Sequence, residues 1–379
     1  MSARTSRIGA LLQRISTPVI LIGGMVAIAL IAQLRGDIIF ERVVTVMFIN
    51  LLLAVALQTF MGNSGLGSFG QYAFVTVGAY VSIWFSLTPL QKRIALPDMP
   101  KEWWLYKQHL GFVPSILIGT VVATLVGALI GAALVRLRGA SFTIATFAFL
   151  IVVNRVALQW QEVTRGARTV IGIPKYTGLW TACLWAAIAV LVAYAFKESS
   201  IGLKLRASRE DEAAAASLGV NVPLTRWIAF LVSVFFSGLG GALWAHFIQQ
   251  FSPHDFYLKE TFLVIAMLVI GGAGSVSGAA IGAVAVALTS EWLRQTENWV
   301  NIQRSTETAF GKLIPFQLVG FTEIIVAVAM IVVLTLRPAG LTRGREIAWP
   351  RGRPRAQANG QGVAGEPASG VESSVESSS

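Results

Sequence analysis

Continuous apolar runs of about 20 residues constrain this chain more than any other feature of its sequence. A helix of about 20 residues spans the hydrocarbon core of a bilayer, whereas a membrane β-barrel needs strands of about ten residues that alternate apolar and polar positions. The runs here do not alternate, so they predict an all-α integral membrane protein. They lie near 19–34, 43–60, 69–88, 112–135, 140–158, 178–196, 225–248, 261–272, 278–293 and 316–336.

These runs predict a polytopic bundle of eight to ten transmembrane helices. The count stays open because 261–272 is short and could form a re-entrant pair with 278–293. With a cytoplasmic amino end, ten spans also place the carboxyl end in the cytoplasm. The difference in Lys and Arg content between the two sets of loops is too weak to fix this orientation. The loops expected on the cytoplasmic side are 61–68, 136–139, 197–224, 273–277 and 337–379.

Charge and cysteine content exclude several other classes of protein. Only 13% of the 379 residues are charged, about half the share in soluble proteins. The single cysteine, Cys183, cannot form an intramolecular disulfide, and the three histidines show no close pair with metal-ligand spacing, so no metal site is predicted. The net charge of +11 is spread along the loops. We therefore expect contact with membrane lipid and none with nucleic acid.

The two ends of the chain differ from the apolar region between them. Residues 1–18 carry three arginines and no acidic residue, and no small-residue cleavage site follows. This pattern predicts a cytoplasmic N-terminal segment before a first span rather than a signal peptide. Residues 19–342 form the predicted transmembrane domain. Residues 343–379 are rich in Arg, Gly, Pro, Ser and Glu, which predicts a disordered cytoplasmic tail.

Glycines interrupt two segments, 62–70 and 271–278, in comparable places on either side of 197–224. Broken helices in two halves are typical of transporters with repeated halves around a pathway at the membrane midplane. Tight helix packing through small residues is the alternative, and both can hold. The first break could also offer backbone N–H groups to a carboxylate. The candidate pathway residues are Asn50, Ser64, Gly65, Gln71 and Glu323.

Two other functions remain open at this stage. Glu323 lies near the middle of the last apolar run, where an ionised carboxylate is costly. It would serve a proton-coupled secondary transporter, or it is a neutral packing contact at a helix interface. Residues 62–65 also match the Gly-x-Ser-Gly pattern around the nucleophile of intramembrane serine proteases, with His246 or His254 as a conceivable base for Ser64. Nothing else in the sequence supports that pair.

The loop at 197–226 is the most polar stretch between the spans, and it carries the signals of a short helix over 209–218. Ser208 can cap the first turn, and Gly219 can end the helix. Four consecutive alanines make its middle thin, and so short a helix is unstable alone in water. We therefore expect it to dock on a partner protein. The residues expected to act in this docking are Ser208, Arg209, Glu210, Asp211, Glu212, Ala213 and Gly219.

The stretch LRASREDEAAAASLGVN in this loop resembles the coupling loop of permease subunits from ABC importers for branched-chain amino acids, in particular the M-type subunit. Six further blocks resemble the same family in the same order, over about residues 40–345. These blocks are Ser64–Tyr80, Leu137–Phe147, Gly172–Pro174, Gly238–Ala242, Gly271–Gly278 and Arg337–Leu341.

The resemblance implies a multi-pass permease of the bacterial inner membrane that translocates branched-chain or other amino acids, or related amides. It implies a sister permease of the H-type, two ATP-binding subunits and a periplasmic or extracellular substrate-binding protein. No phosphate-binding Gly-x-x-x-x-Gly-Lys-Ser/Thr loop occurs in this sequence. ATP and Mg²⁺ would therefore bind to partner subunits, and this chain would be no enzyme and bind no cofactor. The 209–218 helix would couple ATP hydrolysis to transport.

Overall fold

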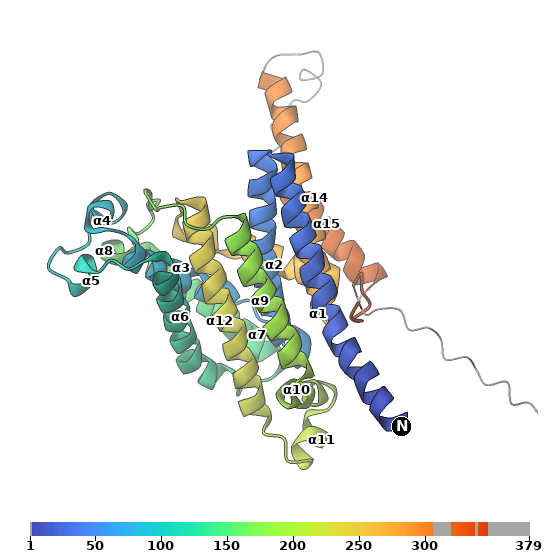
Figure 1. Ribbon diagram of the computed structural model, residues 1–379. Coiled ribbons are helices and arrows are strands. Elements are labelled where there is room, and N and C mark those ends of the chain that lie inside the picture. The colour runs from blue at the N-terminus through green and yellow to red at the C-terminus, as the bar shows by residue number, and fades with distance from the viewer. Residues whose placement is uncertain (1, 306–319, 338–339, 348–379) are drawn as a thin grey trace, which may run out of the picture. The chain divides into compact units, whose positions relative to one another are not determined.

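The computed structural model describes residues 2–305, 320–337 and 340–347 (Figure 1). Within these residues the chain is all-α, apart from an isolated antiparallel bridge between Val170 and Phe251. The predicted fold class is confirmed. The elements are α1 (Ser2–Arg35), α2 (Ile38–Ser64), α3 (Gln71–Ser86), α4 (Pro89–Ala95), α5 (Trp104–Lys107), α6 (Phe112–Leu134), α7 (Gly139–Gln159), α8 (Gln161–Thr164), α9 (Leu179–Glu198), α10 (Ser200–Glu210), α11 (Glu212–Ser217), α12 (Val222–Ile248), the 3-10 helix η1 (Pro253–Phe256), α13 (Leu258–Gly271), α14 (Val276–Ser305) and α15 (Phe321–Leu336).

Each predicted apolar run coincides with a helix, but the helices fall into two length classes. Seven helices in the described residues are long and apolar enough to cross a bilayer: α1, α2, α6, α7, α9, α12 and α14. The other three, α3, α13 and α15, have 16, 14 and 16 residues. A helix of 16 residues is about 24 Å long, less than the hydrocarbon thickness of about 30 Å. For α3, the non-helical segment 65–70 supplies the missing length.

Four loops that the sequence assigns to the cytoplasm, 61–68, 136–139, 197–224 and 273–277, lie together at one end of the bundle, which we call the inner end (Figure 1). The Arg209 Nη1 atom donates to the Gly62 carbonyl at 2.8 Å, which joins α10 to the end of α2. The Lys197 Nζ atom donates to the Gly274 carbonyl at 3.0 Å, which joins the end of α9 to the α13–α14 connection. The inner end therefore collects connections from both halves of the chain.

The opposite, outer end holds α4, α5, α8 and η1. The Trp84 Nε1 atom donates to the Val163 carbonyl at 2.9 Å, and the Asn154 Nδ2 atom donates to the Pro253 carbonyl at 2.8 Å. These bonds join the ends of α3 and α7 to loops that follow in the sequence. The separation of the two sets of loops agrees with the predicted alternation of spans.

A buried lysine fixes the outer loop between α3 and α6. The Lys92 Nζ atom donates to the carbonyls of Leu105, Tyr106 and Gln108 at 2.8, 3.3 and 2.6 Å. Three acceptors use the three protons of an ammonium group. Burial lowers the pKa of Lys92 to about 8, so the charged form persists at neutral pH and holds the loop closed.

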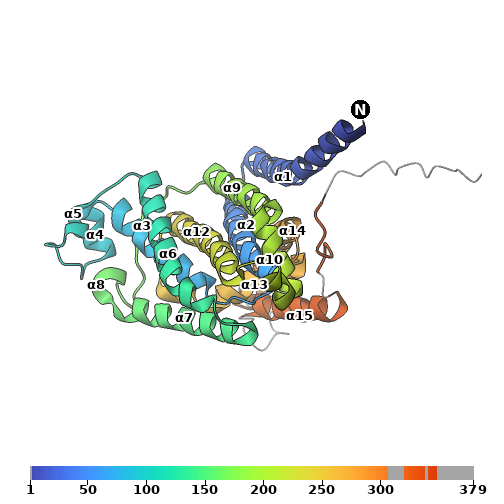
Figure 2. The same ribbon diagram turned by 90° about the horizontal axis from the view of Figure 1, so that it is seen from below.

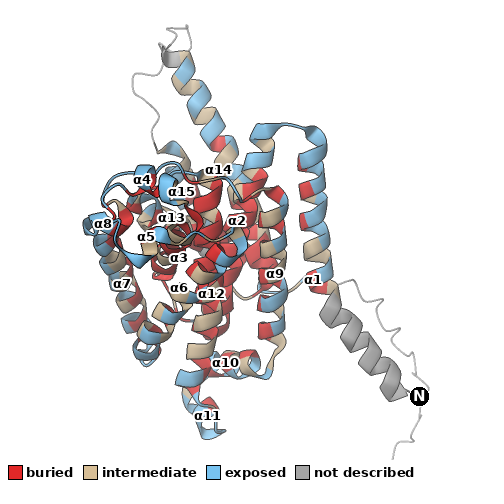
Figure 3. Ribbon diagram, turned by 60° about the vertical axis from the view of Figure 1, so that its left-hand side comes forward, coloured by how far each residue is buried: buried red, intermediate tan, exposed pale blue. Residues whose placement is uncertain are grey.

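Helices α2 and α12 form the interior of the bundle, with α3, α6, α9, α13 and α14 around them (Figure 2). In the apolar window of α2, 89% of the residues are buried, against 28% in α1 and in α7 (Figure 3). Most exposed positions on α6 and α7 are apolar, among them Leu129 and Ile144. In a membrane these faces contact lipid tails. Cys183 of α9 is buried.

Glycine permits the closest helix contact in this interior. A Cβ atom on Gly241 of α12 would lie 2.0 Å from the Val75 carbonyl oxygen of α3, and one on Gly78 would lie 2.1 Å from the Gly238 carbonyl oxygen. Such distances leave no room for any side chain. Backbone contact of this kind is how small residues stabilise helix pairs in membranes, where lipid gives no hydrophobic drive for association.

The predicted N-terminal segment, described from residue 2, is helical and continuous with the first span, because α1 runs from Ser2 through Pro18 to Arg35 and its apolar stretch begins at Ser16. One predicted boundary differs from the structure. Residues 343–347, which the sequence assigned to a disordered tail, belong instead to the helical unit, where Glu346 contacts the start of α14. The rest of the predicted tail, 348–379, lies outside the described residues.

Candidate functional site

The predicted coupling helix over 209–218 is two helices, α10 and α11, that meet at Asp211. There the backbone is extended, with φ −148° and ψ 110°, and the Asp211 Oδ1 atom accepts the Ala214 N–H at 2.9 Å. Asp211 is therefore the N-cap of α11. The prediction that Ser208 caps the helix is wrong, because Ser208 lies within α10 and its Oγ atom donates to the Leu205 carbonyl at 2.8 Å. Gly219, at φ +82°, follows the end of α11 as expected.

Glu212 holds α11 against the bundle. Its Oε2 atom lies 2.9 Å from Arg226 Nη2 at the start of α12, and its Oε1 atom lies 3.2 Å from Arg138 Nε just before α7. The Arg226 side chain is buried, whereas Arg138 is exposed. One carboxylate thus connects α11 to two membrane-spanning helices. The sequence singled out Glu212 but gave no role to Arg138 or to Arg226.

The remaining surface of α11 projects from the inner end (Figure 1). We call it the α11 tip. It is apolar and thin, and Leu218 at its end is 85% exposed. Ala215 is buried and points back to the protein, while Glu210 and Asp211 at the other end of α11 are exposed. A leucine in a polar loop, directly before the glycine that ends a helix, indicates such a surface, but Leu218 is not among the predicted residues. The α11 tip consists of Ala213, Ala214, Ala216 and Leu218.

The two glycine-interrupted segments touch each other beside α10. A Cβ atom on Gly62 would lie 2.1 Å from the Ala273 carbonyl oxygen, so the end of α2 and the α13–α14 connection are in backbone contact. Arg209 of α10 donates to the Gly62 carbonyl and lies over Gly65, whose own Cβ would meet the Arg209 side chain at 2.9 Å. Gly65 itself ends α2, with φ +73°. Arg209 of α10 thus contacts the first segment, which in turn contacts the second.

The α13–α14 connection is held by a charge from the carboxyl-terminal side of α15. The Glu346 Oε1 atom lies 2.5 Å from Lys197 Nζ and accepts the Val276 N–H at 2.9 Å, and its Oε2 atom accepts the Ser277 N–H at 3.0 Å. Burial opposes ionisation of the Glu346 carboxyl, but Lys197 and the hydrogen bonds from Ser277 outweigh it and hold the pKa below its ordinary value. An ionised Glu346 thus caps α14 and neutralises Lys197.

The five candidate pathway residues do not converge. Ser64 and Gly65 lie at the inner end of α2. Gln71 begins α3 and joins it to α12, because its Nε2 atom donates to Ser233 Oγ at 2.6 Å and its Oε1 atom accepts from Ser237 Oγ at 3.0 Å. This is the contact between helices that is expected of a buried amide in a membrane.

The expectation that Glu323 lies mid-span is wrong. Glu323 lies in the first turn of α15, and its carboxylate is 2.6 Å from Lys259 Nζ with both side chains partly exposed. The secondary transporter that would use Glu323 is not supported. The protease dyad is not assembled either. Ser64 lies at the inner end, whereas His246, near the outer end of α12, contacts Ser86 Oγ at 2.8 Å, and His254 belongs to η1 at the outer end.

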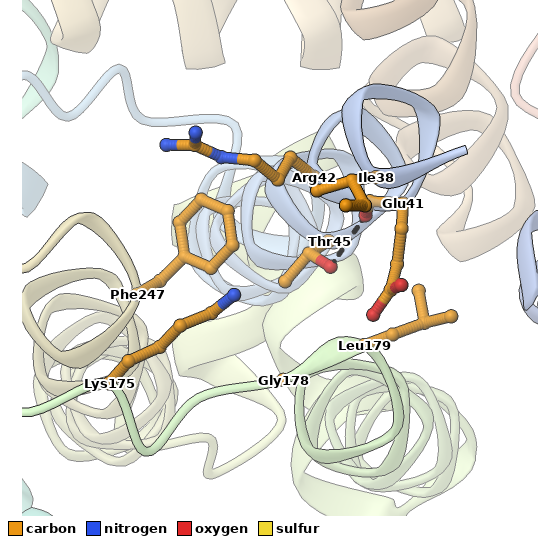
Figure 4. Close-up of a pocket in the computed structure, with 8 residues that line it drawn as sticks. All are labelled: Ile38, Glu41, Arg42, Thr45, Lys175, Gly178, Leu179 and Phe247. Carbon is orange, nitrogen blue, oxygen red and sulfur yellow. Dashed lines mark hydrogen bonds between the residues drawn. The ribbon is translucent and has the colours of Figure 1, made fainter. Parts of the chain in front are cut away.

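Asn50 lines a crevice between α2, α3, α12, η1 and α13. The crevice is bordered by Asn50, Tyr72, Val75, Trp244, Asp255, Phe256 and Glu260. A second hollow opens at the outer end, between the start of α2 and the chain that enters α9 (Figure 4). It is bordered by Ile38, Glu41, Arg42, Thr45, Lys175, Gly178, Leu179 and Phe247. In the described residues no group of three His, Cys, Asp or Glu side chains is placed to hold a metal ion.

Comparison with known proteins agrees with this architecture. Residues 39–336 match the sequence profile of the family described as branched-chain amino acid transport system / permease component. The high-affinity branched-chain amino acid transport system permease protein LivM of Salmonella typhimurium (strain LT2) is 26% identical over 69% of this chain and 64% of its own length. LivM of Escherichia coli (strain K12) is 27% identical over 66% of this chain and 63% of its own length.

Other relatives carry different names. The nucleoside ABC transporter permease protein NupC of Lactococcus lactis subsp. cremoris is 24% identical over 56% of this chain and 68% of its own length. No solved structure matches this chain. The alignments with the two LivM proteins span less than two thirds of those proteins. The family profile, in contrast, covers most of this chain, including the α10–α11 loop and both glycine-interrupted segments, and the chain belongs to the branched-chain amino acid transport system permease family.

Proposed function

We propose that this chain is the M-type permease subunit of an ABC importer in the bacterial inner membrane, and that it moves branched-chain or related amino acids. Its partners in this proposal are an H-type sister permease, two ATP-binding subunits and a periplasmic or extracellular substrate-binding protein. The observation that carries the proposal is the α11 tip, an exposed apolar surface on a helix that Glu212 joins to the bundle. Membership of the permease family supports it.

The contacts of the α10–α11 loop suggest how the movement of an ATPase would reach the membrane. ATP-binding subunits press on the α11 tip, and Glu212 passes the displacement to Arg226 and Arg138 at the starts of α12 and α7. Arg209 passes it to Gly62 and so to both glycine-interrupted segments. This chain binds no ATP and no Mg²⁺ and catalyses no reaction. It supplies one half of a pathway whose access alternates as the partners bind and hydrolyse ATP.

Substitution of Leu218 by Asp tests this proposal. A buried charge in an interface is costly, so Leu218→Asp should reduce co-purification of ATP-binding subunits in mild detergent by about tenfold or more and abolish ATP-dependent amino-acid uptake. Leu203→Asp is the matched control, because Leu203 is an exposed leucine of α10 outside the α11 tip. The membrane level of both variants should equal that of the wild type.

The result that contradicts the proposal is specific. If the wild-type chain is purified from its native membrane without an ATPase and without a second permease, the importer assignment fails. If both partners co-purify but Leu218→Asp behaves as the wild type does, the importer stands and the coupling role of the α11 tip is wrong. Mass spectrometry of the purified material distinguishes these two cases.

A further inference from the structure

The crevice that Asn50 borders lies inside the bundle, beside the point where the chain re-enters it. Asn50 is halfway along α2. The non-helical segment 65–70 runs along α7, where Phe69 N–H donates to Thr146 Oγ1 at 3.3 Å and Thr143 Oγ1 donates to the Gly67 carbonyl at 3.0 Å. Helix α3 then starts at Gln71, so Tyr72 of the crevice belongs to its first turn. Binding sites next to such helix breaks are a recurring arrangement in transporters.

The crevice contains an amide without a partner. Asn50 is 7% exposed, and its side chain forms no hydrogen bond with any other described residue. Neither polar atom of this amide belongs to the fully buried side-chain atoms that lack a hydrogen-bond partner, so both are accessible from the crevice. An accessible amide in a mostly apolar wall is what we expect at a binding site for a polar group.

The crevice also has two carboxylates, those of Asp255 and Glu260. Glu260, in the first turn of α13, forms neither an ion pair nor a hydrogen bond within the described part of the chain, although Lys259 beside it pairs with Glu323. Asp255 uses Oδ2 to accept the Ser252 backbone N–H at 2.7 Å. Its Oδ1 atom accepts no hydrogen bond from a described residue. The carboxylates of Asp255 and Glu260 thus border the same crevice as the Asn50 amide.

The remaining walls of the crevice complete a site for a cation. Tyr72 and Trp244 present aromatic rings, whose faces attract cations, and Val75 and Phe256 are apolar. No lysine, arginine or histidine borders this crevice in the described residues. The outer hollow differs, because Arg42 and Lys175 border it (Figure 4). The charge of this lining favours a cation over an anion.

We propose that Glu260, Asp255 and Asn50 bind the ammonium group of an amino-acid substrate during its passage through the bundle. An ammonium group has three protons to donate, and the crevice offers three acceptors. This inference rests on the proposed transport function, and it says which substrates the permease selects. Substrates with a protonated amine are accepted, whereas neutral nucleosides and simple amides are not.

The test compares Glu260→Gln with Glu162→Gln in the complete transporter, reconstituted in liposomes with the partners that co-purify with it. Glu162 is an exposed carboxylate of α8 at the outer end and borders neither hollow. Glu260→Gln should raise the KM for leucine by about tenfold or more, as expected for loss of a charged hydrogen bond. Glu260→Asp should restore part of the affinity. Glu162→Gln should leave the KM unchanged.

Competition identifies which part of the substrate the crevice binds. Isoamylamine, which has the ammonium group and lacks the carboxylate, should inhibit leucine uptake, and 4-methylpentanamide, which lacks the ammonium group, should not. Glu260→Gln should remove the inhibition by isoamylamine. An unchanged KM for leucine in Glu260→Gln would overturn this inference and leave the importer function intact. ATP-dependent uptake of uridine but not of leucine by the wild type would overturn the amino-acid assignment itself.

Discussion

The two glycine-interrupted connections look alike in sequence, but different forces hold them. The first, 62–70, is fixed by neutral hydrogen bonds to Thr143 and Thr146 of α7 and by Arg209 of α10. The second, 271–278, is fixed by the ionised Glu346, which pairs with Lys197 and caps α14. Neutral hydrogen bonds contribute about 1 kcal/mol each, whereas breaking a buried ion pair costs about 3–5 kcal/mol.

Because of this difference, we expect the two connections to differ in rigidity. The first contacts α10 directly and is held by hydrogen bonds that each cost little to break, so we expect it to change conformation more readily. The second is tied to segment 340–347, where the Leu341 N–H also donates to the Ile270 carbonyl at 2.9 Å. We therefore expect it to be the more rigid of the two connections. Similar sequence patterns in two halves of a transporter do not imply similar mobility.

The contact between the two connections gives the largest expected effect. Gly62→Val places a Cβ atom 2.1 Å from the Ala273 carbonyl oxygen, where neither backbone can give way without breaking the other contacts described above. We expect loss of the folded protein, measured as the disappearance of the monodisperse peak in size-exclusion chromatography. Gly24→Ala is the control, since nothing lies within 4 Å of a Cβ at Gly24. A folded Gly62→Val protein would show that the two connections are not in contact.

The ion pair of the second connection gives the next largest effect. Lys197→Met leaves Glu346 buried without a counter-charge, and we expect a loss of about 3–5 kcal/mol of unfolding free energy. The measurement is the thermal midpoint in detergent, with Lys204→Met as the control because Lys204 is an exposed lysine of α10. The double variant Lys197→Met/Glu346→Gln should regain part of the loss. Equal midpoints for the wild type and Lys197→Met would remove the distinction between the connections.

The first connection gives the smallest effect on stability. Thr146→Val removes the acceptor of the Phe69 N–H and should cost about 0.5–1.5 kcal/mol. Thr124→Val is the control, because Thr124 bonds within its own helix, to the Thr120 carbonyl. If the first connection is the mobile one, Thr146→Val should change the transport rate more than Lys204→Met does, although the protein stays folded. A loss of stability as large as that of Lys197→Met would reverse the comparison.

The sequence predicted the helices well because a bilayer demands long apolar runs, and each run became a helix. It also predicted which loops share an end. It did not predict the break at Asp211, because Ser208 and Asp211 are both good N-cap residues and only the surroundings decide between them. The depth of Glu323 was misjudged for a related reason. Its apolar run, 316–336, begins before Phe321, the first residue of α15, so Glu323 lies well inside the run but only in the first turn of the helix.

Long-range pairs were beyond the reach of sequence reasoning. Gly62 and Ala273, or Lys197 and Glu346, are far apart in the chain, and nothing local marks them as partners. The crevice shows the same limit. Asn50 was singled out as a polar residue at membrane depth, but Tyr72, Trp244 and Glu260 come from three other helices. A carboxylate directly before the apolar run at 261 was the one local signal available.

The burial of Cys183 has a practical consequence for following these movements. The chain has one cysteine, and in α9 its thiol is shielded from the surface. A thiol reagent that cannot enter the bundle therefore has no native target in this subunit. A cysteine introduced at Leu218 would be its single reactive position, and the labelling rate there would report whether that site becomes covered when ATP is added.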